Sequence, residues 1–181
     1  MTRKLDRILV IDIEATCWQG KPPPGQESEI IEIGICPLDV ITGEPLEKES
    51  ILVKPQCSTV SNFCTELTTL TQEQVNQGIT LTEGCAILQE RYESRQQVWA
   101  SYGEYDRQQF TRQCKFRGVK YPFGTRHINV KTLLALQRHL SKEVGMARAL
   151  EILELPLEGT HHRGVDDAGN IARILAKLLW Q

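Results

Sequence analysis

Alternating apolar and polar positions predict a buried strand near the start of the chain. Segment 7–14 places Ile8, Val10, Asp12 and Glu14 on one face and three apolar side chains on the other. Apolar side chains on both faces are typical of a central strand that is covered on both sides. The two acids therefore fall at the C-terminal end of a buried strand.

The same patterns divide the rest of the chain. Further strands are expected at 29–39, 46–54, 97–102 and 127–130, with a hairpin between the first two around Thr42–Gly43. Helices are expected at 82–93, 104–116, 131–139, 146–153 and 165–180, with a short one starting at Thr71. Segment 58–70 is polar and is expected to be irregular. Three strands followed by alternating helices and strands predict an α/β domain with a mixed sheet.

The last predicted helix carries an acid on its apolar face. Asp167 shares one face with Ile171, Ile174 and Leu178. Asp166 falls on the polar neighbouring face, where it is expected to be a solvated acid favoured by the helix N-terminus. An acid on the packed face needs a partner, and a metal ion is one candidate. A simple N-terminal capping acid is the alternative.

The candidate chemistry comes from acids in three separated segments: Asp12, Glu14, Asp106 and Asp167. Close carboxylates at the end of a buried strand are destabilising unless cations neutralise them. Carboxylates without cysteine ligands suit Mg²⁺ or Mn²⁺. A histidine precedes the last acid, and the H-x-x-x-x-D spacing selects His162 over His161. If the fold brings these groups together, a metal-dependent phosphodiesterase follows.

Composition narrows the class of protein. The 181 residues favour one domain over 1–181, and 40% hydrophobic and 24% charged residues are ordinary for a globular protein. We find no long apolar run and no apolar N-terminal leader, so we expect no membrane span and a cytoplasmic location. The six cysteines show no zinc-binding spacing and are expected to be reduced.

Charge is unevenly distributed along the chain. The net charge of −2 excludes a broadly basic nucleic-acid binder. Segment 107–148 is nevertheless rich in Lys and Arg, and Glu143 is its single acid. Such a segment suits contacts with phosphates beside a carboxylate site. A solvated face on two helices is an equally good explanation.

Three segments together resemble the exonuclease motifs of the DEDDh superfamily. They are DIEATCW at 12–18, WASYGEYD at 99–106 and HRGVDDAGNIAR at 162–173. The E-A-T-C-W run is similar to the branch of exoribonucleases that trims histone-mRNA ends and small RNAs, and the resemblance spans roughly residues 7–180. It implies a ribonuclease H-like exonuclease fold, with a central mixed sheet and helices on both faces. Three positions depart from the family pattern, namely Thr69 and Glu154, where Gly is common, and Tyr102, where Trp is frequent.

The resemblance also implies a reaction and a set of roles. The expected activity is a 3′–5′ exonuclease on single-stranded RNA that releases 5′-mononucleotides. Two Mg²⁺ or Mn²⁺ ions would be held by Asp12, Glu14, Asp106 and Asp167, and His162 would be the general base.

Substrate contacts are expected on both sides of the acids. The backbone at Ala15 and Thr16, with Leu67 and Thr68, would contact the terminal sugar, where a hydrogen bond to the 2′-OH would favour RNA. Trp18 would stack on a base or belong to the core, and Tyr102 would border the nucleotide. Single-stranded DNA, short oligoribonucleotides and a non-catalytic RNA-binding role remain as alternatives, and the oligomeric state is undetermined.

Overall fold

The computed structural model describes residues 5–180, which form five strands and seven helices. The strands are β1 (Arg7–Ala15), β2 (Ile30–Asp39), β3 (Glu49–Leu52), β4 (Val98–Ser101) and β5 (His127–Asn129). The helices are α1 (Asn62–Thr68), α2 (Gln72–Asn76), α3 (Leu81–Glu90), α4 (Tyr105–Arg117), α5 (Val130–Gln137), α6 (Met146–Ile152) and α7 (Gly164–Trp180). Within residues 5–180, no helix has both the length and the apolar character that a membrane span requires.

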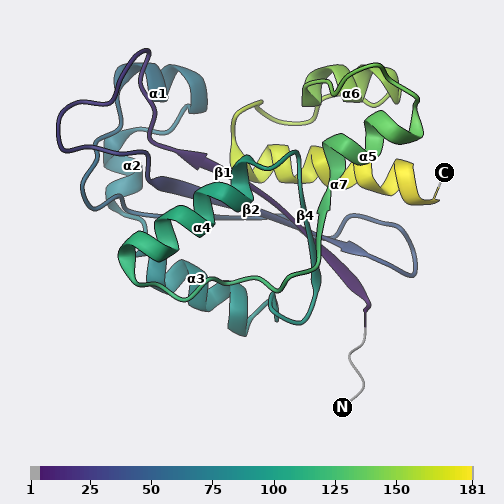
Figure 1. The fold of residues 1–181 in the computed structure, drawn as a ribbon, viewed down its shortest axis with the longest axis horizontal. Coiled ribbons are helices and arrows are strands. Elements are labelled where there is room, and N and C mark those ends of the chain that lie inside the picture. The colour runs from purple at the N-terminus through teal and green to yellow at the C-terminus, as the bar shows by residue number, and fades with distance from the viewer. Residues whose placement is uncertain (1–4, 181) are drawn as a thin grey trace.

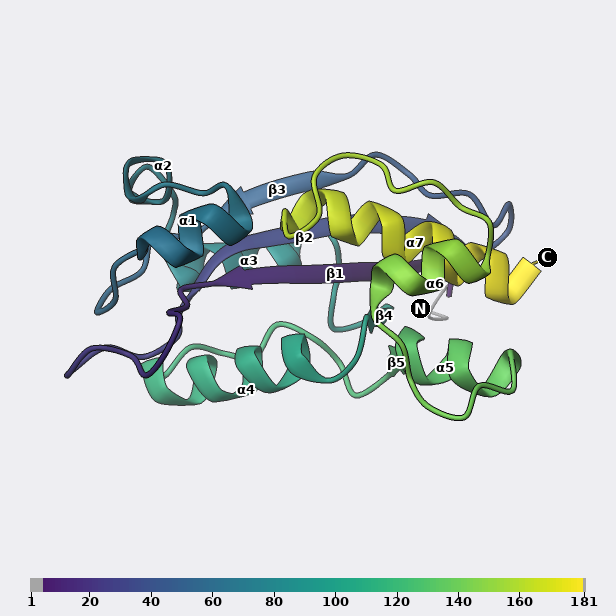
Figure 2. The same ribbon diagram turned by 90° about the horizontal axis from the view of Figure 1, so that it is seen from above.

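One mixed sheet organises the molecule, in the order β3-β2-β1-β4-β5 (Figure 2). Strand β1 is antiparallel to β2 and parallel to β4, and β4 is parallel to β5. The C-terminal ends of β1 and β4 therefore lie at the same end of the sheet. In open α/β sheets this is where ligands bind. Helix α4 follows β4 after a short turn, so its first turn lies at that end too.

Helices cover both faces of the sheet, as Figure 1 shows. Ile8 and Val10 of β1 pack with α5, α6 and α7. Leu9 and Ile11 point to the opposite face and pack with α3 and α4. Each fully buried side chain of this size contributes about 1.5–3 kcal/mol. The predicted α/β architecture, with a mixed sheet buried on both faces, is confirmed.

Helix α7 approaches β2 closely because Gly34 has no side chain. A Cβ at Gly34 would lie 1.9 Å from the carbonyl oxygen of Gly164, the first residue of α7. A Cβ at Gly164 would in turn lie 3.1 Å from the carbonyl oxygen of Asp12. The two glycines thus bring the start of α7 to the acidic end of β1.

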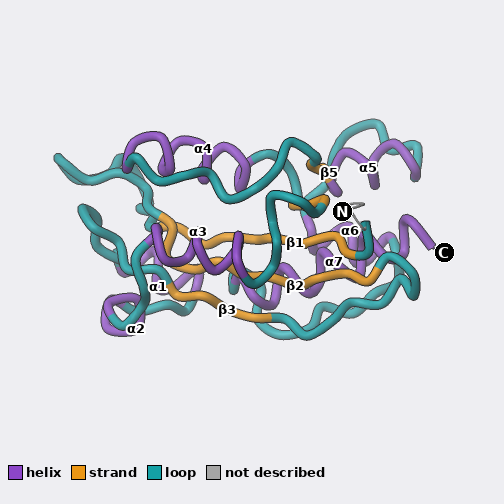
Figure 3. Tube along the Cα trace, turned by 90° about the horizontal axis from the view of Figure 1, so that it is seen from below, coloured by secondary structure: helices purple, strands orange, loops and turns teal. Residues whose placement is uncertain are grey.

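Segment 58–70 was expected to be irregular, but it contains α1. The Ser61 hydroxyl caps this helix by accepting a hydrogen bond from the Cys64 amide at 3.0 Å. Helix α1 is only seven residues long, which is too short for its few apolar positions to establish a helical period in the sequence. The expected strand at 46–54 is also shortened, to Glu49–Leu52. Figure 3 shows the extended loop that leads into it.

Candidate active site

Strand β1 delivers two carboxylates to the face that α7 covers. Asp12 is aligned with Gly34, and Glu14 with Glu32, in the register between β1 and β2. Because side chains alternate along a strand, Asp12 and Glu14 point to the same face. Asp12 is half-buried and Glu14 is buried, so both carboxylates have lost much of their contact with water.

The first turns of two helices supply the other two acids. Asp106 lies in α4 and Asp167 in α7, and both are buried. The Asp106 carboxylate accepts a hydrogen bond from the Ile13 amide at 3.0 Å, which joins α4 to β1. Asp166 lies outside the cluster, where it is ion-paired with Lys48 at 2.5 Å rather than merely solvated.

The four acids line one cavity of about 340 Å³. Carboxylate oxygens of Asp12, Glu14 and Asp167 lie within 4.8 Å of one another. Burial, followed by repulsion from neighbouring carboxylates, raises the pKa of Asp12 well above its usual range and the pKa of Glu14 to about 9. Burial also raises the pKa of Asp106 to about 7, although the Ile13 amide opposes it, and raises the pKa of Asp167. The cavity therefore favours either protons or cations on its acids.

Both histidines of the His161–His162 pair border this cavity. The backbone amide of His162 donates to Asp167 Oδ2 at 2.9 Å, and His161 Nδ1 lies 2.9 Å from the same oxygen. The two rings stack, with centroids 3.9 Å apart. Burial, followed by the neighbouring His161, lowers the pKa of His162 and favours a neutral imidazole that can accept a proton. Spacing had singled out His162, but the structure brings both rings to the site.

Glu32, which no sequence pattern indicated, is fully buried beside the cluster. Its carboxylate accepts hydrogen bonds from the Arg163 guanidinium, with both contacts at 3.2 Å, and from the Gly164 amide at 2.8 Å. The Ser50 hydroxyl donates to it at 2.6 Å. Glu32 thus holds the segment between His162 and Asp167. Arg163 is 131 positions away from Glu32 in the sequence, so no local pattern could have revealed this contact.

Aromatic and apolar side chains complete the cavity wall. Tyr102, Tyr105 and Met146 all line it, and only Tyr102 was expected there. The Tyr102 hydroxyl donates to the Val144 carbonyl at 2.9 Å, which fixes the ring against the segment that leads into α6. Tyr105 sits beside Asp106 at the start of α4, so its position follows from that acid.

The other expected substrate contacts lie outside the acid cavity. Trp18 and Thr16 line a second cavity of about 370 Å³. The Ala15 carbonyl accepts a hydrogen bond from a thiol of α1, which places α1 beside the end of β1. Leu67 is exposed, whereas Thr68 is buried and its hydroxyl donates to a backbone carbonyl within α1. The Thr68 hydroxyl is therefore already hydrogen-bonded within α1, and of these two side chains that of Leu67 is the exposed one.

Comparison with known proteins identifies the family. A family model described as Exonuclease matches residues 9–175. The crystal structure of the nuclease domain of 3'hExo, a DEDDh family member, bound to rAMP superposes with a TM-score of 0.84 at 30% identity. That match covers 97% of this chain and 92% of the other. The chain belongs to the DEDDh exonuclease family. The ribonuclease H-like exonuclease fold implied by the motifs is therefore confirmed.

Two further relatives show how far the likeness extends. The human protein "3'-5' exoribonuclease 1" is 32% identical over 96% of this chain and 52% of its own length. A structure that describes 3'-end specific recognition of histone mRNA stem-loop by 3'-exonuclease has a TM-score of 0.85 at 29% identity. It covers 97% of this chain and 64% of the other. The chain spans about half the length of the human, rat and mouse exoribonuclease 1 proteins it matches.

Proposed function

We propose that this exonuclease-family chain is a metal-dependent 3′–5′ exonuclease that removes 5′-mononucleotides from single-stranded RNA. One observation carries the proposal: acids from β1, α4 and α7 line a single cavity together with two histidines. Phosphodiester hydrolysis by a pair of cations needs a dense set of carboxylates of this kind. The family supports the same reaction class.

The donor set fits hard divalent cations. Asp12, Glu14, Asp106 and Asp167 would hold two Mg²⁺ or Mn²⁺ ions, because carboxylate oxygens are the ligands these ions prefer. The described residues bring no cysteine thiol into the cavity, so a zinc site is disfavoured. When bound, the ions would polarise the phosphodiester and make the attacking water more acidic.

The protein groups around the ions have separate tasks. His162, held neutral by its surroundings, would accept the proton of the attacking water. Glu32 would keep the segment from His162 to Asp167 in place through Arg163 and Gly164. The 3′-oxygen of the preceding nucleotide would leave, so each cycle shortens the strand by one 5′-mononucleotide.

RNA is the substrate we favour. Two relatives carry RNA or a ribonucleotide in their descriptions, and a human relative is named an exoribonuclease. Backbone groups at Ala15 and Thr16, at the end of β1, would lie where a terminal ribose could present its 2′-OH. Single-stranded DNA remains the second candidate, because the acid cavity by itself does not distinguish the sugars.

The deciding experiment uses RNA and DNA of the same sequence, each labelled at its 5′ end. We expect stepwise shortening of RNA in Mn²⁺ or Mg²⁺, slower shortening of DNA, and no reaction with a chelator. Asp12→Ala should abolish activity because one of the four proposed metal ligands is lost. Asp166→Ala, which removes an adjacent acid outside the cavity, serves as the matched control and should retain activity.

Several outcomes would contradict the proposal. Unchanged turnover in Asp12→Ala would remove the metal mechanism. Shortening of DNA as fast as RNA would remove the preference for RNA. Tight RNA binding without any turnover would instead indicate a binding module on an exonuclease fold.

A further inference from the structure

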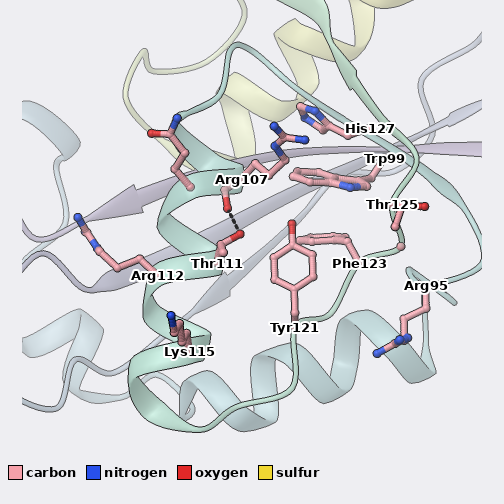
Figure 4. A pocket seen from close by; sticks show the side chains of 12 residues that line it. Arg95, Trp99, Arg107, Thr111, Arg112, Lys115, Tyr121, Phe123, Thr125 and His127 are labelled. Atoms are coloured by element: carbon pink, nitrogen blue, oxygen red, sulfur yellow. Dashed lines mark hydrogen bonds between the residues drawn. The ribbon is translucent and has the colours of Figure 1, made fainter.

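A separate groove lies beside α4, outside the acid cavity, and its floor is formed by side chains of the core. It has a volume of about 690 Å³ and runs between α4 and the segment Tyr121–His127. Figure 4 shows Arg107, Arg112 and Lys115 projecting from α4 on one side, with Tyr121 and Phe123 on the facing segment. None of the assigned roles uses this groove.

The rim of the groove is basic. Arg95, Arg107, Arg112 and Lys115 line it, and no Asp or Glu does. Arg107 is paired with Glu104 at 2.7 Å, whereas Arg95 and Lys115 are exposed and have no ion pair within residues 5–180. In a protein of net charge −2, a groove with this lining is a local site for a polyanion.

Three of the seven other positive residues in segment 107–148 form ion pairs outside the groove. Arg117 binds the buried Glu29 at 2.7 Å, Lys131 lies 3.9 Å from Glu143, and Arg148 pairs with Glu151 at 2.6 Å. Arg107, Arg112 and Lys115 of that segment line the groove together with Arg95 from outside it, so the groove gathers positive side chains from two parts of the chain.

The floor of the groove is aromatic and well ordered by packing. Trp99 stacks on Phe123 with ring centroids 4.3 Å apart, and Tyr121 meets Phe123 edge-on at 5.7 Å. Trp99 and Phe123 are buried, while Tyr121 is half-buried. Tyr121 therefore offers a ring, supported from below, on which an unstacked base can lie.

The groove adjoins the region where the substrate is expected. Arg107 follows Asp106 directly in α4, so the groove begins one residue after a candidate metal ligand. Arg112 lines both the groove and the second cavity, which holds Thr16 and Trp18. A strand whose 3′ end lies among the acids would pass the first turn of α4 to reach the groove.

We propose that this groove binds the part of a single-stranded nucleic acid that lies upstream of its 3′ end. The inference rests on the proposed function for its direction along the strand. Phosphates would contact the four basic side chains, and a base would lie on Tyr121. The site would favour longer strands over short ones, because a short strand held at its 3′ end does not extend into the groove.

Binding is tested without turnover, in chelator, with 5′-fluorescein RNA and DNA of about 12 nucleotides. Arg95→Glu combined with Lys115→Glu should weaken binding on the order of 10-fold at low salt. It should also reduce the slope of log affinity against log salt by about 1.4, since each single-strand phosphate contact contributes about 0.7. The control, Lys54→Glu with Arg138→Glu, makes the same change in net charge at exposed positions outside the groove.

The aromatic part of the proposal has its own pair of variants. Tyr121→Leu removes the ring and should weaken binding on the order of 10-fold, whereas Tyr121→Phe keeps the ring and should bind like the unaltered chain. Thermal unfolding of each variant shows whether the fold is kept. A Tyr121→Leu protein that fails to fold leaves the charge-reversal pair as the test.

Each outcome has a defined meaning. If the groove variant and the control variant lose the same binding affinity, the effect comes from net charge alone and the proposed site is wrong. A polyglutamate peptide that competes as well as RNA at equal charge would mean an acidic-peptide site instead. The binding test is done without metal, so it remains valid even if the chain does not hydrolyse RNA. If the chain is an active exonuclease but the Arg95 and Lys115 variant binds RNA as tightly as the unaltered chain, the proposed groove is wrong and the proposed function stands.

Discussion

At the scale of single residues, two neighbouring histidines contact the same carboxylate oxygen of the acid cavity, and substitutions can separate their roles. Asp167 receives the His162 backbone amide on the same oxygen that faces the His161 ring. A backbone contact survives side-chain substitution, whereas a ring contact does not. Substituting each histidine in turn therefore separates a proton-transfer role from one that orients Asp167.

We expect His162→Ala to lower kcat on the order of 10²–10⁴-fold, because the general base is lost. His161→Ala should lower it less, on the order of 10-fold, because that ring contacts Asp167 without taking the proton. Single-turnover rates at saturating Mn²⁺ measure both. A loss below about threefold in His162→Ala would assign His162 a structural role.

Glu32→Gln should lower activity although Glu32 is not one of the four proposed metal ligands. The amide lacks the charge that pairs with Arg163, so the segment from His162 to Asp167 would lose its anchor. We expect a fall in kcat and in metal affinity on the order of 10–100-fold, with folding destabilised by about 3 kcal/mol.

Ser50→Ala is the matched control for that variant. It removes another hydrogen bond to Glu32 while leaving the contacts to α7 intact. Metal affinity measured well below the unfolding temperature separates positioning from stability. If Glu32→Gln loses stability but binds Mn²⁺ like the unaltered chain, Glu32 is structural only.

At the scale of elements, two departures from the family pattern fall on strained helix ends. Thr69 ends α1 with φ 63°, and Glu154 follows α6 with φ 56°. These are left-handed conformations, which cost a side-chain-bearing residue about 1–2 kcal/mol and which glycine adopts freely. The backbone at both positions therefore suits the glycine that the resemblance implies there.

Thr69→Gly and Glu154→Gly should therefore each stabilise the folded chain, by about 0.5–1 kcal/mol after the added entropy of the unfolded glycine is subtracted. Urea unfolding measures the change. Gln77→Gly is the control, because Gln77 ends α2 at φ −87°, where glycine relieves no strain. A gain at Gln77 equal to that at Thr69 would contradict the explanation.

At the scale of the whole molecule, the acid cavity lies where strands and helices meet, and the carboxylates that line it repel one another. Asp12, Glu14 and Asp167 converge where β1, β2 and α7 meet, and burial with mutual repulsion raises the pKa values of these acids. Ionising them at neutral pH therefore opposes folding. Divalent cations would convert this repulsion into attraction.

Mn²⁺ should accordingly stabilise the chain, by about 2.7 kcal/mol at a concentration 100 times its Kd. Asp12→Asn should unfold at a higher temperature than the unaltered chain in chelator, because one repulsive charge is gone. It should gain little from added Mn²⁺. Thermal unfolding with and without metal measures both effects, and equal stabilisation of both proteins by Mn²⁺ would place the ions elsewhere.

The sequence by itself determined those features that rest on local periodicity. Alternation over 7–14 identified the central strand. Helical spacing placed Asp167 on the packed face of α7, and in the structure Asp167 is a member of the acid cluster. The prediction for segment 58–70 was wrong because α1 is only seven residues long and begins at the Ser61 cap, so the local pattern is too short to identify it.

Only the tertiary structure decided which distant groups meet. Glu32 binds Arg163 across 131 positions, and the groove forms where α4 faces the Tyr121–His127 segment. His161 also reaches the site, next to His162 with its left-handed φ of 64°, and the spacing of residues in the sequence predicts neither feature. The physical reason is common to all three: each contact depends on how elements pack in space, whereas sequence patterns report only neighbours along one strand or helix.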